Sequence, residues 1–286
     1  MVSKHELSIA IPASLVSDIP HLREKTLKIG MVGRAAAIFG VDEIIVFPDT
    51  PHGNQGREID LIATILSYME TPQYLRKRLF KIKPKLRYVG VLPPLRTPHH
   101  PLPSRVKDLI DGGYREGAVV SHTKDGTLVD VGVERFTLVW NKKMPINTRV
   151  TVRIKRTKKQ LEAEVASRSE IAEYWGYRVT RSNLMLGKFL KKQVFDLIIA
   201  TSKYGKPFME TSKKLITRWK TSHKILVAFG APTRGLYEII KQENLNLDEI
   251  ADFVVNTIPC QRVETVRTEE ALHVTLGILS LMVAKG

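Results

Sequence analysis

The residues best suited to bind a small ligand lie in three short segments, each directly after an apolar run. These segments are Thr201–Gly205, Gly230–Gly235 and Asn256–Pro259. Glycine lets a backbone approach a ligand closely, and free backbone amides can bond an adenine ring or a carboxylate. If the apolar runs are parallel strands, their carboxyl ends meet at one sheet edge, where open α/β sheets bind ligands. The alternative is that each glycine only forms a turn.

The C-terminal segment is the most distinctive of the three. The apolar run 253–255 predicts a buried strand, and Pro259 prevents its ladder from continuing. After a polar loop, Thr268 is the predicted N-cap of a helix with two glutamates in its first turn, where the helix dipole favours them. An apolar stripe on this helix either packs on its own sheet or contacts a second subunit. The stripe consists of Leu272, Leu276, Leu279 and Met282.

These segments resemble motifs of the SPOUT methyltransferases, which are knotted enzymes that bind S-adenosylmethionine. The segments 256–259 and 265–271 are similar to their C-terminal signature, and 227–236 resembles the preceding knot loop. The segment 29–40 resembles the N-terminal motif that carries a functional arginine, here Arg34. The resemblance extends over nearly the whole chain, to the subfamily of RNA methyltransferases in which a small β-barrel interrupts the SPOUT domain.

The resemblance implies an S-adenosylmethionine pocket, a dimer and a role for Arg34 as the catalytic arginine. A guanidinium is always charged and can form two parallel bonds, which suits the orientation of a target nucleotide in its own or the partner's pocket. Arg262 stands where many relatives have glycine and is expected to reach substrate phosphate. Ile258 and Val263 are expected to supply apolar walls. The expected cofactor-binding residues are Thr201, Gly230, Gly235, Asn256, Ile258, Thr265 and Val266.

Methyl transfer also requires that the acceptor be held in place and lose a proton. Glu264, Glu269 and His273 are possible bases by position, and the sequence selects none of them. Cys260 is the single cysteine, so internal disulfides and a zinc site built from cysteine pairs are excluded; we expect a buried, inert thiol. The pair His99-His100 has no further ligand at a suitable spacing, and no metal is expected.

The charge balance favours a polyanionic partner. Lysine and arginine number 45 against 29 acidic residues, which gives a formal net charge of +16. The basic residues cluster in the segments 76–87 and 149–159, a pattern typical of a surface that follows phosphates, although either cluster alone could be a solvated face. The residues expected to bind RNA are Arg153, Lys155, Arg156 and Arg262.

The apolar pattern divides the chain into two predicted domains. Residues 1–92 and 174–286 alternate short apolar runs with helical stripes, and this order predicts a parallel α/β sheet, SPOUT-type and trefoil-knotted by resemblance. Residues 93–173 contain a proline-rich crossing and five runs of period two, which predict an inserted all-β barrel, OB-like or SH3-like. The strands predicted for the sheet are Leu7–Ile11, Glu43–Phe47, Arg87–Leu92, Val194–Ala200, Ile225–Phe229 and Phe253–Val255.

The function indicated by these observations is that of an S-adenosylmethionine-dependent RNA methyltransferase, a homodimer acting on ribosomal RNA. A uridine base nitrogen is the acceptor that the resembled subfamily favours. Two alternatives stay open: a protein arginine methyltransferase acting on a ribosomal protein, and a non-catalytic RNA-binding assembly factor. The sequence contains no run of about 18 apolar residues, so it predicts no membrane span. Residues 1–10 lack the long apolar core of a signal peptide, and a cytoplasmic location is therefore expected.

Overall fold

The computed structural model describes residues 5–51, 53–156 and 161–283. The chain divides into two compact units. The first, here called the sheet unit, comprises Met1–Ser67, Arg87–Pro93 and Tyr177–Gly286. The second, the barrel unit, comprises Tyr68–Leu86 and Pro94–Gly176. Each unit is built from elements that are distant in the sequence.

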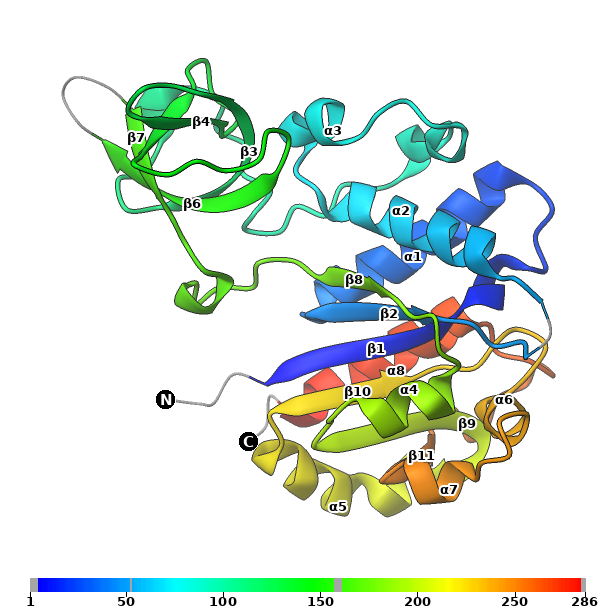
Figure 1. The fold of residues 1–286 in the computed structure, drawn as a ribbon. Coiled ribbons are helices and arrows are strands. Elements are labelled where there is room, and N and C mark those ends of the chain that lie inside the picture. Colours follow the sequence, from blue (N-terminus) through cyan, green and yellow to red (C-terminus); the bar gives the residue numbers. More distant parts are fainter. Residues whose placement is uncertain (1–4, 52, 157–160, 284–286) are drawn as a thin grey trace. The chain divides into compact units, whose positions relative to one another are not determined.

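The sheet unit contains a six-stranded sheet in which all paired strands are parallel (Figure 1). The central strands are mainly apolar because helices cover both of their faces, as is usual for parallel sheets. The strands lie in the order β11-β9-β10-β1-β2-β8. Their bounds are β1 Glu6–Pro12, β2 Glu43–Phe47, β8 Arg178–Arg181, β9 Leu197–Pro207, β10 Lys224–Ala228 and β11 Phe253–Asn256.

Helices lie on both faces of this sheet (Figure 1). On one face, α4, α6 and α7 form a core cluster with alternate strand residues such as Ala10, Leu226 and Ala228. On the other, α1 contacts α8, and α8 contacts α5. The helix bounds are α1 Leu22–Ile38, α2 Gly56–Glu70, α4 Leu186–Lys192, α5 Phe208–Thr221, α6 Leu236–Lys241, α7 Leu247–Ile250 and α8 Thr268–Val283.

The barrel unit contains a closed five-stranded barrel and the helix α3, Gln73–Leu79. The barrel order is β3-β4-β5-β7-β6, with β6 also paired to β3; β5 and β7 are parallel and the other pairs antiparallel. Inward valines such as Val119, Val129 and Val152 form its core. The bounds are β3 Tyr114–His122, β4 Gly126–Asp130, β5 Thr137–Trp140, β6 Arg149–Arg156 and β7 Leu161–Val165. The predicted parallel sheet and inserted barrel are therefore confirmed.

Some local predictions need correction. The strand predicted for 87–92 is wrong, because Val89–Val91 forms a single 3₁₀ turn whose residues are not buried and which prolines follow. The edge strand β8 was not predicted from its sequence, since three of the four residues of Arg178–Arg181 are polar and none is buried. The turn predicted at Thr157–Gln160 lies outside the described residues. The remaining 3₁₀ turns are Ala13–Val16, Pro84–Leu86, Val106–Asp108 and Arg168–Glu170.

A buried network of charged side chains stabilises the barrel unit. The Arg149 guanidinium donates to Glu70, with Nη2 3.0 Å from Oε1, and its Nε donates to Glu116. His99 Nε2 donates to the Glu70 carbonyl at 3.0 Å, and Trp175 Nε1 donates to Glu116 at 2.6 Å. Burial by itself would raise the pKa of Glu70, but the charge of Arg149 and the hydrogen bonds from His99 and Arg149 lower it to about 2. Glu70 is therefore ionised in the folded chain at neutral pH.

Glu70→Gln is expected to lower the free energy of unfolding by about 2 kcal/mol at pH 7, because it leaves Arg149 without a full counter-charge. The pKa of Glu70 is depressed in the folded state, so the contribution of the carboxylate is complete above pH 4.5 and is lost as the pH falls toward about 2. Urea unfolding at pH 7 and pH 3 measures both effects. The exposed Glu173→Gln is the matched control, and a Glu70→Gln loss that is equal at both pH values would contradict the assignment.

Candidate functional site

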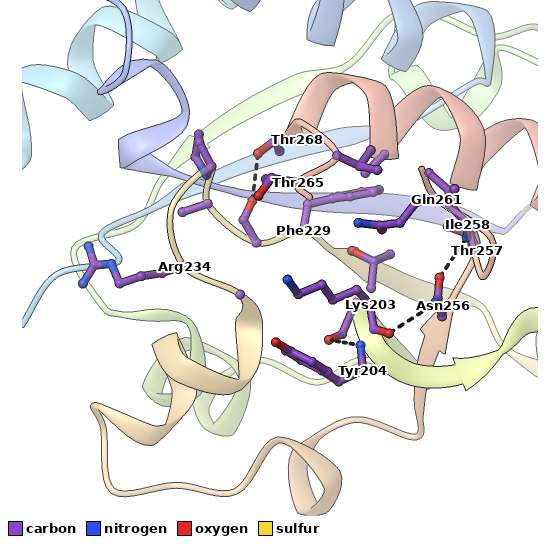
Figure 2. A pocket seen from close by; sticks show the side chains of 18 of the residues that line it. Lys203, Tyr204, Phe229, Arg234, Asn256, Thr257, Ile258, Gln261, Thr265 and Thr268 are labelled. Carbon is purple, nitrogen blue, oxygen red and sulfur yellow. Dashed lines mark hydrogen bonds between the residues drawn. The ribbon is translucent and has the colours of Figure 1, made fainter. Parts of the chain in front are cut away.

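A cavity of about 200 Å³ lies in the sheet unit where β9, β10 and β11 end and α8 begins (Figure 2). The position is the one that parallel sheets use for ligands, outside the carboxyl ends of the strands. All seven residues expected to bind the cofactor line it: Thr201, Gly230, Gly235, Asn256, Ile258, Thr265 and Val266. The structure thus brings together three segments that are separated in the sequence by at least twenty residues each.

The first of these segments is not a loop. Residues 201–205 stay within β9 as a long bulge, because Val254 of β11 pairs with Ala200 whereas the next residue, Val255, pairs with Lys206. A side chain at Gly205 would lie 2.8 Å from the Val254 carbonyl oxygen, so the bulge requires glycine there. The excursion takes five residues out of the ladder, and four of them, Thr201 to Tyr204, line the cavity.

Side-chain hydrogen bonds tie the segments to one another. The Thr201 hydroxyl donates to the Ala228 carbonyl at 2.9 Å, which joins β9 to β10. Asn256 donates from Nδ2 to the Lys203 carbonyl at 3.0 Å, and its Oδ1 accepts the Ile258 N–H at 2.9 Å (Figure 2). The side chains of Thr201 and Asn256 therefore hold the segments around the cavity in place, and the backbone next to them is available to contact a ligand.

Thr268 has a different role from the predicted N-cap. It is the first residue of α8, and its hydroxyl donates to the Gly230 carbonyl at 2.8 Å (Figure 2). The capping contact is made instead by Glu270, whose carboxylate accepts the Arg267 N–H at 2.9 Å. The start of α8 is thus fixed to the loop that follows β10.

The two glycines of that loop have different surroundings. A Cβ at Gly230 would meet the Arg234 carbonyl oxygen, the Gly235 Cα and the Leu236 nitrogen, each at 3.3 Å. A Cβ at Gly235 would meet no atom within 4 Å, so the bare backbone there borders open space beside the cavity. Backbone groups, hydroxyls and the apolar Phe229 and Ile258 together fit a ligand with polar ends and a flat ring.

Arg234 anchors the same loop to the ends of β1 and β2. Its side chain points away from the cavity (Figure 2), and its Nη2 lies 2.9 Å from the Thr50 hydroxyl and 3.4 Å from a buried Asp49 carboxylate oxygen. Asp49 also accepts from the Ser14 N–H at 3.1 Å and from Gln55 Nε2 at 2.9 Å. The buried carboxylate is satisfied on several sides, so the loop is held in one position.

Of the three possible bases, only Glu264 lines the cavity. Glu269 is buried and pairs with Lys28 at 3.5 Å, and His273 Nδ1 donates to the Glu269 carbonyl at 2.7 Å, so both serve the packing of α8. Sequence reasoning missed Glu238, which also lines the cavity from α6. Its position three residues after Gly235, where the predicted loop segment ends, was the only available signal.

Several residues expected near the site do not line the cavity. Arg34 is on α1, Arg262 is exposed, and Val263 is 57% exposed, so the apolar wall expected of Val263 is wrong. Cys260 is exposed and not buried as expected. The α8 stripe packs within its own chain, where Leu272, Leu276 and Leu279 are buried and Met282 is partly buried.

The three basic residues expected to bind RNA in the barrel unit lie together on β6 and are exposed. Lys155 pairs with Glu164 of the neighbouring strand β7, Arg153 Nε donates to the Gly112 carbonyl at 3.2 Å, and Arg156 Nη1 donates to the Leu109 carbonyl at 3.2 Å. Their charges lie on the protein surface, but each side chain already has a partner. Any RNA contact must therefore share or replace these bonds.

The part of the chain that the structure describes has no features of a metal centre or of a membrane-spanning helix. In the segments 5–51, 53–156 and 161–283, no cluster of three or more His, Cys, Asp or Glu side chains could hold a metal ion. Among the helices of this described part, none is both long and apolar enough to cross a membrane.

The comparisons with known proteins agree with the geometry of the cavity. A family model described as "Putative RNA methyltransferase" matches residues 6–279. The chain belongs to this family. Membership confirms the predicted activity, methyl transfer to RNA, and implies S-adenosylmethionine as the methyl donor.

The RNA methyltransferase family includes relatives that match nearly the whole chain. An uncharacterized protein of Haloarcula marismortui is 34% identical over 287 residues, which cover 96% of this chain and 98% of the relative. The 28S rRNA (uridine-N(3))-methyltransferases of Mus musculus and Homo sapiens are 32% and 31% identical over 305 residues. Those matches cover 96% of this chain and 76% and 78% of the two relatives.

Proposed function

We propose that the protein methylates ribosomal RNA at N3 of a uridine and binds S-adenosylmethionine in the cavity at the ends of β9, β10 and β11. The observation that carries this proposal is the meeting of all seven expected cofactor residues in one cavity. The activity for which the mouse and human relatives are named supports the nucleotide and the atom. The formal charge of +16 supports an RNA substrate.

We assign the sheet unit to the SPOUT fold, with the trefoil knot that the resemblance implies. The order β11-β9-β10-β1-β2 supports this assignment, as does the position of the motif residues where β10 and β11 end. The closed five-stranded barrel, in which the third and fifth strands are parallel, supports an OB-type Greek key over an SH3-like barrel. The domain limits 1–92 with 174–286, and 93–173, remain predictions, as does a cytoplasmic location.

The chain's own residues account for binding and proton transfer in this proposal. When bound, S-adenosylmethionine supplies a methyl group activated by a positively charged sulfur. The uridine N3 gains the methyl and loses one proton, and we assign the acceptance of that proton to a carboxylate of the cavity, Glu264 or Glu238. The fixed loops at Gly230 and Asn256 hold the two reactants in line, which is the main contribution that a protein can make to such a transfer.

We further propose that the protein is a homodimer in which Arg34 serves the partner's site. Arg34 does not line the cavity of its own chain. On α1 it shares a face with three exposed apolar side chains at helical spacing, Leu27 (41% exposed), Met31 (46%) and Ile38 (55%). Apolar residues that gather on one exposed helix face favour contact with another subunit. The α1 face, and not the α8 stripe, supports the dimer.

The direct test is incubation with isotope-labelled S-adenosylmethionine and rRNA from cells that lack the gene. We expect label in the rRNA, released on digestion as N3-methyluridine, and little label in rRNA from cells that carry the gene, where the site is already methylated. Ribosomal proteins form the second arm. Label in a ribosomal protein alone, recovered as methylarginine, would support a protein arginine methyltransferase, and cofactor binding without any label would favour an assembly factor.

Reversing Arg153, Lys155 and Arg156 to glutamate is expected to weaken RNA binding and to flatten its dependence on salt, because fewer counterions are released on binding. If all three contact phosphate, the slope of log affinity against log salt should decrease by about 2 to 3. Affinities measured between 50 and 200 mM salt, roughly the range over which such contacts matter, test this. The control reverses three exposed lysines of α5, Lys213, Lys214 and Lys220, and an equal change in both variants would exclude a specific role for the barrel.

A further inference from the structure

The bulge of β9 presents two side chains whose exposure the fold does not explain. Lys203 and Tyr204 both line the cavity, and Tyr204 is 74% exposed. The Lys203 ammonium lies 5.2 Å from the centroid of the Tyr204 ring (Figure 2). A ring this exposed buries little surface on folding, so it contributes little to the stability of the chain.

The backbone that carries this ring is fixed from both sides. The Tyr204 N–H donates to the Ser202 hydroxyl at 3.1 Å, and the Lys203 carbonyl accepts from Asn256 of β11 at 3.0 Å. Gly205 fits against the backbone of β11 with no room for a side chain. An exposed aromatic ring on a fixed backbone, at the edge of a cavity, is the arrangement of a binding platform and not of a mobile loop tip.

We propose that Tyr204 is the platform on which the methyl-accepting base stacks, and that Lys203 pairs with a neighbouring phosphate of the same RNA strand. This inference rests on the proposed function. A base must leave its stack to reach an atom deep in an enzyme, and proteins receive unstacked bases on exposed aromatic rings. The ammonium adjacent to the ring suits the phosphate that accompanies such a base.

The ring chemistry also limits the ligand that the platform can take. Stacking uses the face of the ring and tolerates any base, so Tyr204 supplies affinity, while the polar groups of the cavity supply the choice of uridine. In the described part of the chain, no hydrogen bond of the Tyr204 hydroxyl is found near the cavity. The platform function should therefore depend on the ring and not on the hydroxyl.

Tyr204→Ala is expected to lower kcat/KM for the rRNA substrate by roughly 5- to 150-fold, the scale of losing one stacked base. Tyr204→Phe should retain most of the activity, because the ring remains. The affinity for S-adenosylmethionine, measured by calorimetry, should be equal in wild type and both variants. Lys203→Ala should decrease the salt slope of RNA binding by about 1. Met209→Ala is the control, since Met209 is 79% exposed and does not line the cavity.

The outcomes separate this inference from the function on which it rests. If wild type methylates no RNA, the proposed function fails and the platform with it. If wild type methylates rRNA but Tyr204→Ala is as active as wild type, the platform alone is overturned. A Tyr204→Ala variant with weakened cofactor binding would assign the ring to the cofactor, and an inactive Tyr204→Phe would assign the role to the hydroxyl.

Discussion

Gly230→Arg is expected to lower the affinity for S-adenosylmethionine by roughly 100-fold or more, a loss of at least ~3 kcal/mol of binding free energy. The Gly230 backbone lines the cavity, and its carbonyl accepts the Thr268 hydroxyl. Even a Cβ at this position would come within 3.3 Å of three backbone atoms of residues 234–236. A long charged side chain must therefore occupy the cavity or displace the loop that borders it, and either change removes the binding surface.

The control for this substitution is Gly90→Arg in the same unit, at an exposed glycine where an added Cβ would meet no atom within 4 Å. Calorimetry measures cofactor binding in both variants, and circular dichroism with thermal unfolding shows whether each variant is folded. We expect Gly90→Arg to bind as wild type does. A folded Gly230→Arg variant that also binds as wild type does would mean that the cofactor site is elsewhere.

The cavity could be predicted from sequence because its parts are local patterns. Each of the three segments follows an apolar run, and a parallel sheet brings the ends of such runs to one edge, so Gly230 and Asn256 needed no long-range information to be assigned to one site. The same reasoning gave the five strands of the barrel, where period two and turn residues are local signals. Both kinds of prediction depend on short stretches of chain.

The contacts that hold the cavity in shape could not be predicted in this way. Arg234 bonds to Asp49 across 185 positions of sequence, and nothing near either residue indicates the other. Thr268 has the residue type and position of an N-cap, but its hydroxyl bonds instead to Gly230, 38 positions away. Tertiary partners determined the role of these side chains, and local propensity could only suggest that they were polar and near a turn.

Exposure was the other quantity that the sequence could not supply. The α8 stripe was a possible dimer contact, and the structure buries it against its own sheet unit. The exposure of the α1 residues Leu27, Met31 and Ile38 could not be predicted from the sequence, because a helical stripe has the same spacing whether it faces a core or solvent. Only the folded chain shows whether a stripe is buried or exposed. The exposed stripe is on α1, the helix that carries Arg34, and it is this helix that supports the proposed dimer.

Arg34→Ala is expected to leave the affinity for S-adenosylmethionine near that of wild type but to slow turnover by roughly 100-fold, the usual scale for removing a positioned charge at a reacting centre. Arg34 does not line its own cavity, so cofactor binding should not depend on it. The exposed Arg23→Ala on the same helix is the control and should be as active as wild type. An equal loss of cofactor affinity and turnover in Arg34→Ala would instead indicate a structural role.

Mixing Arg34→Ala with Gly230→Arg should then restore activity if each site is shared between two chains. In a mixed dimer, the intact cavity of the first variant meets the intact arginine of the second, so one of the two sites is complete. Random exchange at equal amounts makes half of the dimers mixed, and about one quarter of wild-type activity should return in a two-fold symmetric dimer. Each variant alone should keep only the low activity expected of it above, far below one quarter of wild type. If the subunits exchange, as mass spectrometry of the mixture can establish, and no activity returns, each site is built from a single chain and Arg34 acts within its own subunit or not at all.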